Sequence, residues 1–223
     1  MRPEELATCI DHTFLAATAT EARIVQLCQE ALRYGFKSVS VNGNWTRLCA
    51  DLLSESNVVV STVIGFPLGA MSQKVKILEA VRALDDGAKE LDMVLNIGWL
   101  KEGRFDKIKD EVTAIKECCL DRTLKVIIET CLLSEEEKAA CCSTILESGA
   151  DFVNTSTGFS TGGASEKDVA TLKSLLNGNV KVKASGGIRS YDTALAMLAS
   201  GADRLGTSSG IAIIQGAEAH AAY

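Results

Sequence analysis

The chain has 223 residues, of which 47% are hydrophobic and only 5% aromatic, and its formal net charge is −6. This length suits one barrel or one doubly wound sheet, so we expect a single domain over residues 1–223 with an aliphatic core. An acidic chain without a basic block offers no electrostatic surface for nucleic acid. An anionic ligand would therefore need a local cationic or backbone N–H site.

Membrane and metal partners are also not expected. The opening MRPEELATCIDHT is charged, and no apolar run approaches the roughly 20 residues of a membrane span, which predicts a cytoplasmic protein. The eight cysteines show no metal-type spacing, and only His12 and His220 can supply imidazole ligands. We expect reduced cysteines that pack as small hydrophobic residues, with no metal and no cofactor.

A recurring pattern of helix end, glycine and apolar strand divides the chain. It is found at Gly35, Gly87, Gly149 and Gly201, where glycine permits the left-handed conformation that ends a helix. The pattern predicts strands near 8–12, 38–42, 58–64, 90–96, 124–129, 151–155, 180–184 and 203–207. Helices are expected near 20–34, 44–55, 71–86, 104–119, 134–148, 165–176, 190–200 and 209–214.

Helix caps support these boundaries. Ser134 is followed three residues later by Glu137, which predicts a capping box, and Ser165 and Ser190 stand at two other helix starts. Strict strand–helix alternation predicts an α/β fold, and eight units favour a (β/α)8 TIM barrel. A doubly wound sheet is the alternative, although no GxGxxG follows the first strand.

Catalytic residues of such a barrel are expected at the C-terminal ends of its strands. Asp92 lies within an apolar strand, where Asp92, Val94 and Asn96 should share one face. Lys183 ends the seventh strand and should point into the barrel at the catalytic rim, with Lys181 at the opposite rim. Burial of such polar groups costs several kcal/mol unless they are paired or used.

A phosphate site is predicted from two glycine-rich turns. Gly186-Gly187 follows the seventh strand and Ser208-Ser209 the eighth, where barrels often bind phosphate through backbone N–H groups.

The end of the first strand supplies two further candidates for substrate binding, Asp11 and Thr13, whereas His12 is interpreted as a structural imidazole. Glu129, at the end of strand five, is expected to support the site or to form an ion pair inside the barrel.

Six ordered segments resemble the 2-deoxyribose-5-phosphate aldolases. They are Ile10–Thr13, Val63–Gly69, Glu90–Val94, Ile128–Leu133, Thr155–Phe159 and Lys183–Arg189, and the likeness extends to the terminal Tyr223. The resemblance implies a metal-free class I aldolase that reversibly cleaves 2-deoxy-D-ribose 5-phosphate to D-glyceraldehyde 3-phosphate and acetaldehyde. It also implies that Asp92 is the proton-transfer carboxylate and Lys183 the second lysine, and Thr157 is a further substrate-binding candidate.

The chain departs from the family at residue 154. Asn154 stands where the resemblance places the lysine that forms an imine with the substrate. An amide nitrogen is not a useful nucleophile, although Asn154 can still donate and accept hydrogen bonds. Three interpretations stay open: an aldolase with little or no activity, a non-catalytic sugar-phosphate-binding pseudoenzyme, and an aldolase whose iminium forms on Lys183. The expected partners are a small-molecule sugar phosphate and, as an alternative to a monomer, further copies of the chain.

Overall fold

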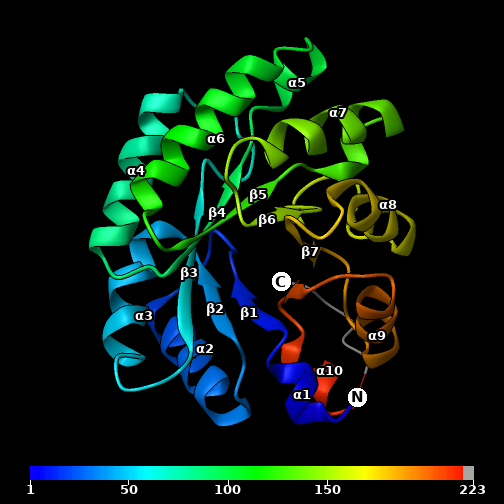
Figure 1. The fold of residues 1–223 in the computed structure, drawn as a ribbon. Helices are drawn as coiled ribbons and strands as arrows, with labels where there is room; N and C mark the ends of the chain where they lie inside the picture. The colour runs from blue at the N-terminus through cyan, green and yellow to red at the C-terminus, as the bar shows by residue number, and fades with distance from the viewer. Residues whose placement is uncertain (218–223) are drawn as a thin grey trace.

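Eight parallel strands pair in sequence order and close into a barrel in the computed structural model, which describes residues 1–217 (Figure 1). β1 pairs with both β2 and β8, which closes the sheet and confirms the predicted (β/α)8 barrel. The strands are β1 (Ile10–Phe14), β2 (Ser38–Val41), β3 (Val59–Ile64), β4 (Glu90–Val94), β5 (Thr123–Ile127), β6 (Phe152–Asn154), β7 (Lys181–Ser185) and β8 (Arg204–Thr207). The assignment of residues 1–223 to one domain stays a prediction, and His220 and Tyr223 lie outside the described residues.

Helices surround the barrel and connect its strands (Figure 1). They are α1 (Pro3–Ala7), α2 (Glu21–Tyr34), α3 (Thr46–Leu52), α4 (Gln73–Asp85), α5 (Ile97–Lys101), α6 (Phe105–Cys119), α7 (Glu135–Leu146), α8 (Glu166–Leu176), α9 (Tyr191–Ala199) and α10 (Gly210–Ile214), with 3-10 turns η1 (Gly43–Trp45) and η2 (Thr130–Leu132). The predicted caps at Ser134, Ser165 and Ser190 each accept a backbone N–H, and Ser134 completes the capping box with Glu137. No helix of residues 1–217 is long and apolar enough to span a bilayer.

The structure corrects one strand boundary near the predicted site. β4 ends at Val94, and the Asn96 side chain accepts the Trp99 backbone N–H as the cap of α5, a helix that the sequence pattern did not predict. Asn96 was expected on the face of Asp92, and that prediction is wrong because an asparagine that caps a helix leaves the strand.

Strand alternation separates an apolar outer face from a polar inner face. In β4, for example, Leu91 and Met93 belong to the buried apolar core beneath the helices, whereas Glu90 and Asp92 make polar contacts inside the barrel. Many barrels fill their interior with branched apolar side chains. This barrel has charged side chains in its interior instead, so ionisable groups lie close together along the barrel axis.

A buried ion pair joins the outer helices to the C-terminal end of β4. Lys76 of α4 donates to Glu111 of α6 at 2.9 Å, and both side chains are fully buried. The same ammonium donates to the backbone carbonyl of Val94, also at 2.9 Å. The pair therefore fixes α4 and α6 relative to the strand that carries Asp92.

We predict that Glu111→Ala destabilises the protein strongly, because it leaves the Lys76 ammonium buried without its carboxylate. The free energy of unfolding from urea titration should fall by about 3–5 kcal/mol. Glu147→Ala is the matched control, because it removes a carboxylate that pairs with Lys109 at the surface, and it should change stability little. Equal effects of the two substitutions would contradict this account of the buried pair.

Candidate active site

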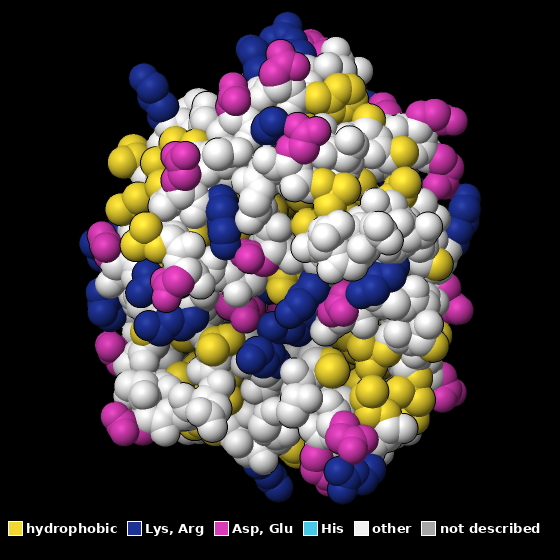
Figure 2. Space-filling model, viewed as in Figure 1, with side chains coloured by type: hydrophobic (Ala, Val, Ile, Leu, Met, Phe, Trp, Pro, Cys, Tyr) yellow, Lys and Arg dark blue, Asp and Glu magenta, His cyan; other side chains and the backbone are white. Residues whose placement is uncertain are grey.

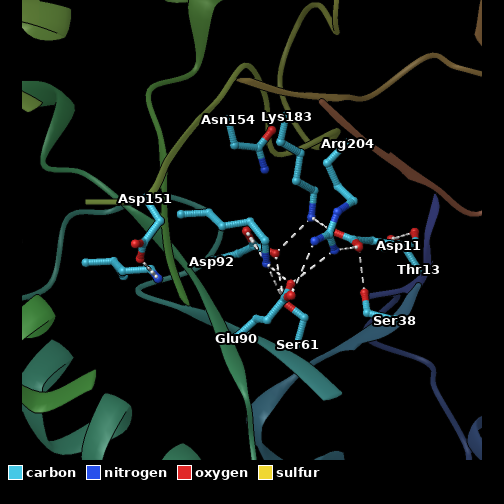
Figure 3. A network of polar contacts seen from close by, with 12 residues as sticks. Asp11, Thr13, Ser38, Ser61, Glu90, Asp92, Asp151, Asn154, Lys183 and Arg204 are labelled. Carbon is cyan, nitrogen blue, oxygen red and sulfur yellow. Dashed lines mark hydrogen bonds and ion pairs between the residues drawn. The ribbon is translucent and has the colours of Figure 1, made fainter. Parts of the chain in front are cut away.

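Charged side chains from five strands meet inside the barrel, in the space that we call the lumen (Figure 3). Two serine hydroxyls join them, since Ser38 donates to Asp11 at 2.7 Å and Ser61 to Asp92 at 3.0 Å. All members of this lumen network are buried. Its charged members are Asp11, Glu90, Asp92, Lys125, Lys183 and Arg204.

Lys183 lies between two carboxylates of this network. Its Nζ is 2.6 Å from Oδ2 of Asp11 and 2.9 Å from Oδ2 of Asp92, and the side chain is 3% exposed. Burial acts to lower the pKa of the Lys183 ammonium, but the two carboxylates outweigh burial and keep that pKa above its ordinary value. Lys183 is therefore a cation at neutral pH.

Lys125 and Arg204 supply the other cations of the lumen network. Lys125 Nζ is 2.6 Å from Oε2 of Glu90 and 3.5 Å from Oδ1 of Asp92. Arg204 Nη1 is 2.6 Å from Oδ1 of Asp11 and 3.2 Å from Oε2 of Glu90. The sequence patterns did not indicate these two cations or Glu90 as parts of the site. Two-residue spacing from Asp92 could have identified Glu90 as a lumen residue, but nothing in the sequence indicated its partners.

Asp11 and Asp92 of the lumen network are ionised. Burial acts to raise the pKa of both Asp11 and Asp92, but the surrounding cations more than reverse this effect and hold both pKa values below their usual range. For Asp92 the main cationic neighbours are Lys125 and then Lys183. Asp92 is thus a buried carboxylate that lacks a proton and can accept one.

A pocket at the C-terminal ends of the strands brings most of the predicted site residues together. Asp92, Asn154 and Lys183 line it, and so do five of the predicted substrate-binding residues: Thr13, Thr157, Gly186, Gly187 and Ser208. Asp11 and Ser209 do not line the pocket. Asp11 is fully buried below it in the lumen network, and the Ser209 N–H donates to Thr207 Oγ1.

Asn154 ends β6 next to Lys183. The two residues are direct partners in the register of β6 and β7, so their side chains leave the sheet on the same face. Figure 3 shows both side chains pointing into the lumen. Asn154 is 2% exposed, and its Oδ1 accepts the Ser156 backbone N–H at 3.4 Å. Position 154 therefore places a neutral amide beside the Lys183 ammonium.

The two turns predicted to bind phosphate are both at the pocket. Gly186 and Gly187 have φ values of 82° and 78°, which favour glycine, and open space surrounds the position where a Cβ of Gly187 would lie. Within residues 1–217, the backbone N–H groups of Gly187 and Ser208 have no hydrogen-bond acceptor. Both N–H groups are therefore available to an anion.

Glu129 and Thr157 support each other instead of facing a substrate. The Thr157 hydroxyl and backbone N–H both donate to the Glu129 carboxylate, and the same hydroxyl oxygen accepts the Phe159 N–H. Glu129 has φ 55° and forms no ion pair with another described residue, so the expected ion pair inside the barrel is not formed. These bonds order the loop after β6, and they leave the Thr157 hydroxyl little capacity for a ligand.

His12 is a structural residue. Its Nε2 is 2.8 Å from Oε2 of Glu30, and its ring stacks at 4.6 Å on Phe36. Residues 1–217 contain no group of three or more histidine, cysteine and acidic side chains arranged to hold a metal ion.

Comparison with known proteins gives a consistent answer. A family model described as "DeoC/LacD family aldolase" matches residues 6–216. The chain is 53% identical over 212 residues to a deoxyribose-phosphate aldolase from Finegoldia magna, which covers 95% of this chain and 100% of that protein. It is 49% identical over 219 residues to one from a Geobacillus species, with 98% of each covered.

Solved structures agree with the sequence relatives. The barrel is similar, with a TM-score of 0.94 and 39% identity, to a structure described as a putative deoxyribose-phosphate aldolase from Coccidioides immitis, covering 96% of this chain and 86% of that one. It is also similar, with a TM-score of 0.89 and 35% identity, to the aldolase from Aeropyrum pernix described as tetrameric, covering 96% of this chain and 91% of that one.

We predict that Asp92→Asn lowers the pKa of Lys183 by about 1–3 units, because it removes one of two adjacent carboxylates while burial continues to oppose the charge. The ¹⁵N NMR signal of Lys183 Nζ should remain that of an ammonium above the ordinary lysine pKa of about 10.4 in the unchanged chain, and should titrate earlier in the variant. Glu147→Gln, far from the lumen, should leave this titration unchanged. An unaltered Lys183 pKa in Asp92→Asn would show that Asp92 is not a principal partner.

Proposed function

Because the chain belongs to the DeoC/LacD family of aldolases, we propose that it is a class I aldolase of 2-deoxy-D-ribose 5-phosphate with little activity. The reaction would be reversible cleavage to D-glyceraldehyde 3-phosphate and acetaldehyde. The observation that carries the proposal is the place of Asn154, which lies beside Lys183 in the pocket that Asp92 also lines. The resemblance of the flanking segment implies that the family's Schiff-base lysine stands at this position.

The chemistry explains why position 154 would decide activity. In class I aldol cleavage a neutral primary amine attacks the substrate carbonyl carbon, and loss of water gives an iminium. As the carbon–carbon bond breaks, its electron pair moves into this iminium, and hydrolysis later returns the amine. The amide nitrogen of Asn154 is delocalised into its carbonyl and cannot begin this sequence. Asp92, ionised and 2.9 Å from Lys183, is suited to proton transfer.

Neither Lys183 nor Lys125 can readily replace the missing nucleophile at position 154. Lys183 is held as an ammonium between Asp11 and Asp92, and a protonated amine has no electron pair with which to attack. Lys125 is fully buried between Glu90 and Asp92 and does not line the pocket. This arrangement argues against the alternative in which the iminium forms on Lys183.

The charge of the lumen network favours a neutral amine at position 154. Three carboxylates already face three cations there, so a further ammonium would find no uncommitted carboxylate in the network. A lysine at 154 would also lie beside the Lys183 ammonium, which would lower its pKa.

The substrate phosphate would bind at the two turns of the pocket. We assign the substrate phosphate to the Gly186-Gly187 turn and Ser208, which line the pocket, since the Gly187 and Ser208 N–H groups have no acceptor within residues 1–217. A cytoplasmic location stays a prediction.

Assembly of several copies is supported by α4, where Val75, Leu78 and Val81 are 48%, 69% and 42% exposed on one helical face.

We predict that Asn154→Lys raises aldolase turnover by about a thousandfold or more, because it restores the whole covalent route. The rate should increase with pH as the new amine, whose pKa lies below the ordinary 10.4 or so, loses its proton. Cleavage of deoxyribose 5-phosphate is followed by the release of acetaldehyde. Asn154→Met is the matched control, since it supplies an unbranched chain that matches lysine as far as Cε but has no amine, and it should stay as slow as the unchanged chain.

Borohydride reduction with peptide mapping locates any iminium in the same experiments. The label should be found on residue 154 of the Asn154→Lys variant. Rapid turnover by the unchanged chain, with the label on the Lys183 peptide, would overturn the proposal in favour of Lys183 as nucleophile.

We also predict that Gly187→Asp weakens binding of deoxyribose 5-phosphate by about tenfold or more, because a carboxylate would face the phosphate at the turn. Gly187→Asn is the matched control: both residues tolerate a positive φ better than most, and only the charge differs. Calorimetric titration measures both affinities. Equal affinities of the two variants would remove the Gly186-Gly187 turn from the phosphate site.

The alternative function is a non-catalytic protein that binds sugar phosphate, and the intact phosphate turns beside Asn154 favour it. If the Asn154→Lys variant binds deoxyribose 5-phosphate but remains inactive, this alternative replaces the aldolase proposal. Absence of binding to the unchanged chain at about millimolar ligand would contradict both.

A further inference from the structure

A second cavity lies at the end of the barrel where the strands begin, opposite the candidate active site. It has a volume of about 530 Å³, and we call it the N-terminal cavity. Its lining comes from the first residues of β6, β7 and β8 and from the segments that precede β2 and β3. Four of its lining residues are ionisable with charge at neutral pH: Lys37, Lys181, Asp203 and Arg204.

The figures show this end of the barrel. In Figure 1 the helices from α2 to α9 follow one another clockwise, and right-handed crossovers then place the starts of the strands toward the viewer. Figure 2, in the same view, shows Lys and Arg side chains gathered around the middle of the face, among a smaller number of acidic ones. An acidic chain of net charge −6 thus presents a local basic surface over the barrel axis.

The charges of the N-terminal cavity are not balanced within the described residues. Asp203 is committed to other partners, because it accepts from Lys173 at 2.8 Å and from the Val182 N–H at 2.9 Å. Lys37 and Lys181 form no ion pair with any residue of 1–217. Two ammonium groups at one concave site therefore lack a counter-charge.

The Phe152 ring contacts two cations of the N-terminal cavity, Lys181 and Arg204. Its ring lies 5.6 Å from Lys181 Nζ and 5.6 Å from the guanidinium carbon of Arg204, and the side chain is 5% exposed. Contact of a cation with a buried aromatic face restricts where that cation can go. The arrangement is thus more ordered than a set of mobile surface lysines.

We propose that the N-terminal cavity is a second binding site for a small phosphate-bearing anion. The Arg204 guanidinium is already bound by Asp11 and Glu90, so the available charge comes from Lys37 and Lys181. Lysine binds phosphate as a point charge and needs no fixed two-pronged geometry, whereas arginine suits the planar carboxylate. The cavity volume also falls within the range of small-molecule sites, about 300–1,000 Å³.

The experiment titrates inorganic phosphate into the Gly187→Asp variant, in which the active-site turn is blocked, and follows binding by calorimetry. In this background, Lys37→Gln with Lys181→Gln should weaken phosphate binding by about tenfold or more. The matched control, Lys74→Gln with Lys107→Gln, removes the same charge from exposed positions of α4 and α6 and should change affinity by less than about twofold.

NMR on the unchanged chain tests the same site without a substitution. Phosphate should shift the backbone amide signals of Lys37 and Lys181, and citrate at equal ionic strength should compete weakly, since the site lacks a free arginine. Equal loss of affinity in the two double variants, or no phosphate-dependent shift at Lys37 and Lys181, would overturn the proposal. Stronger binding of citrate than of phosphate would overturn the assignment to phosphate.

Discussion

The pairing of charges inside the barrel is the constraint on which the rest of the structure depends. A charge removed from water costs several kcal/mol unless it is compensated, and this lumen contains three carboxylates and three cations. Asp92 lies opposite Lys125 in the register of β4 and β5, and Lys183 lies opposite Arg204 in that of β7 and β8. A slip of one residue would turn these groups outward and break several pairs at once.

The same pairing connects the two ends of the barrel. Arg204 lines the N-terminal cavity and contacts Oδ1 of Asp11, while Oδ2 of Asp11 contacts Lys183 in the candidate active site. A single ion-paired carboxylate, Asp11, therefore links Arg204 at the basic end to the Lys183 ammonium in the candidate active site. A negative charge placed near Arg204 would compete for its guanidinium and leave Asp11 more available to Lys183, so the electrostatics of the two cavities cannot be independent.

The sequence predicted the barrel because local signals repeat along it. Glycine at four helix ends, serine at several helix starts and apolar strands all agree, and the closed sheet confirms the result. Local patterns also placed Asp92 and Lys183 in one pocket, since strand ends meet at one end of a barrel. They could not show that Asp11 is buried below the pocket or that Ser209 turns away from it, because partners such as Arg204 are distant in sequence.

The place of Asn154 also explains how a chain can keep this fold while its proposed chemistry is lost. Asparagine is neutral, as an imine-forming amine must be before it attacks, so it leaves no unpaired charge in the lumen network. It is smaller than lysine, and its Oδ1 still accepts the Ser156 N–H. Asn154 therefore leaves the ion pairs of the lumen network undisturbed. Identity of 53% over 95% of the chain establishes the family relationship, whereas the proposed loss of the covalent step concerns one side chain that the barrel does not need in order to fold.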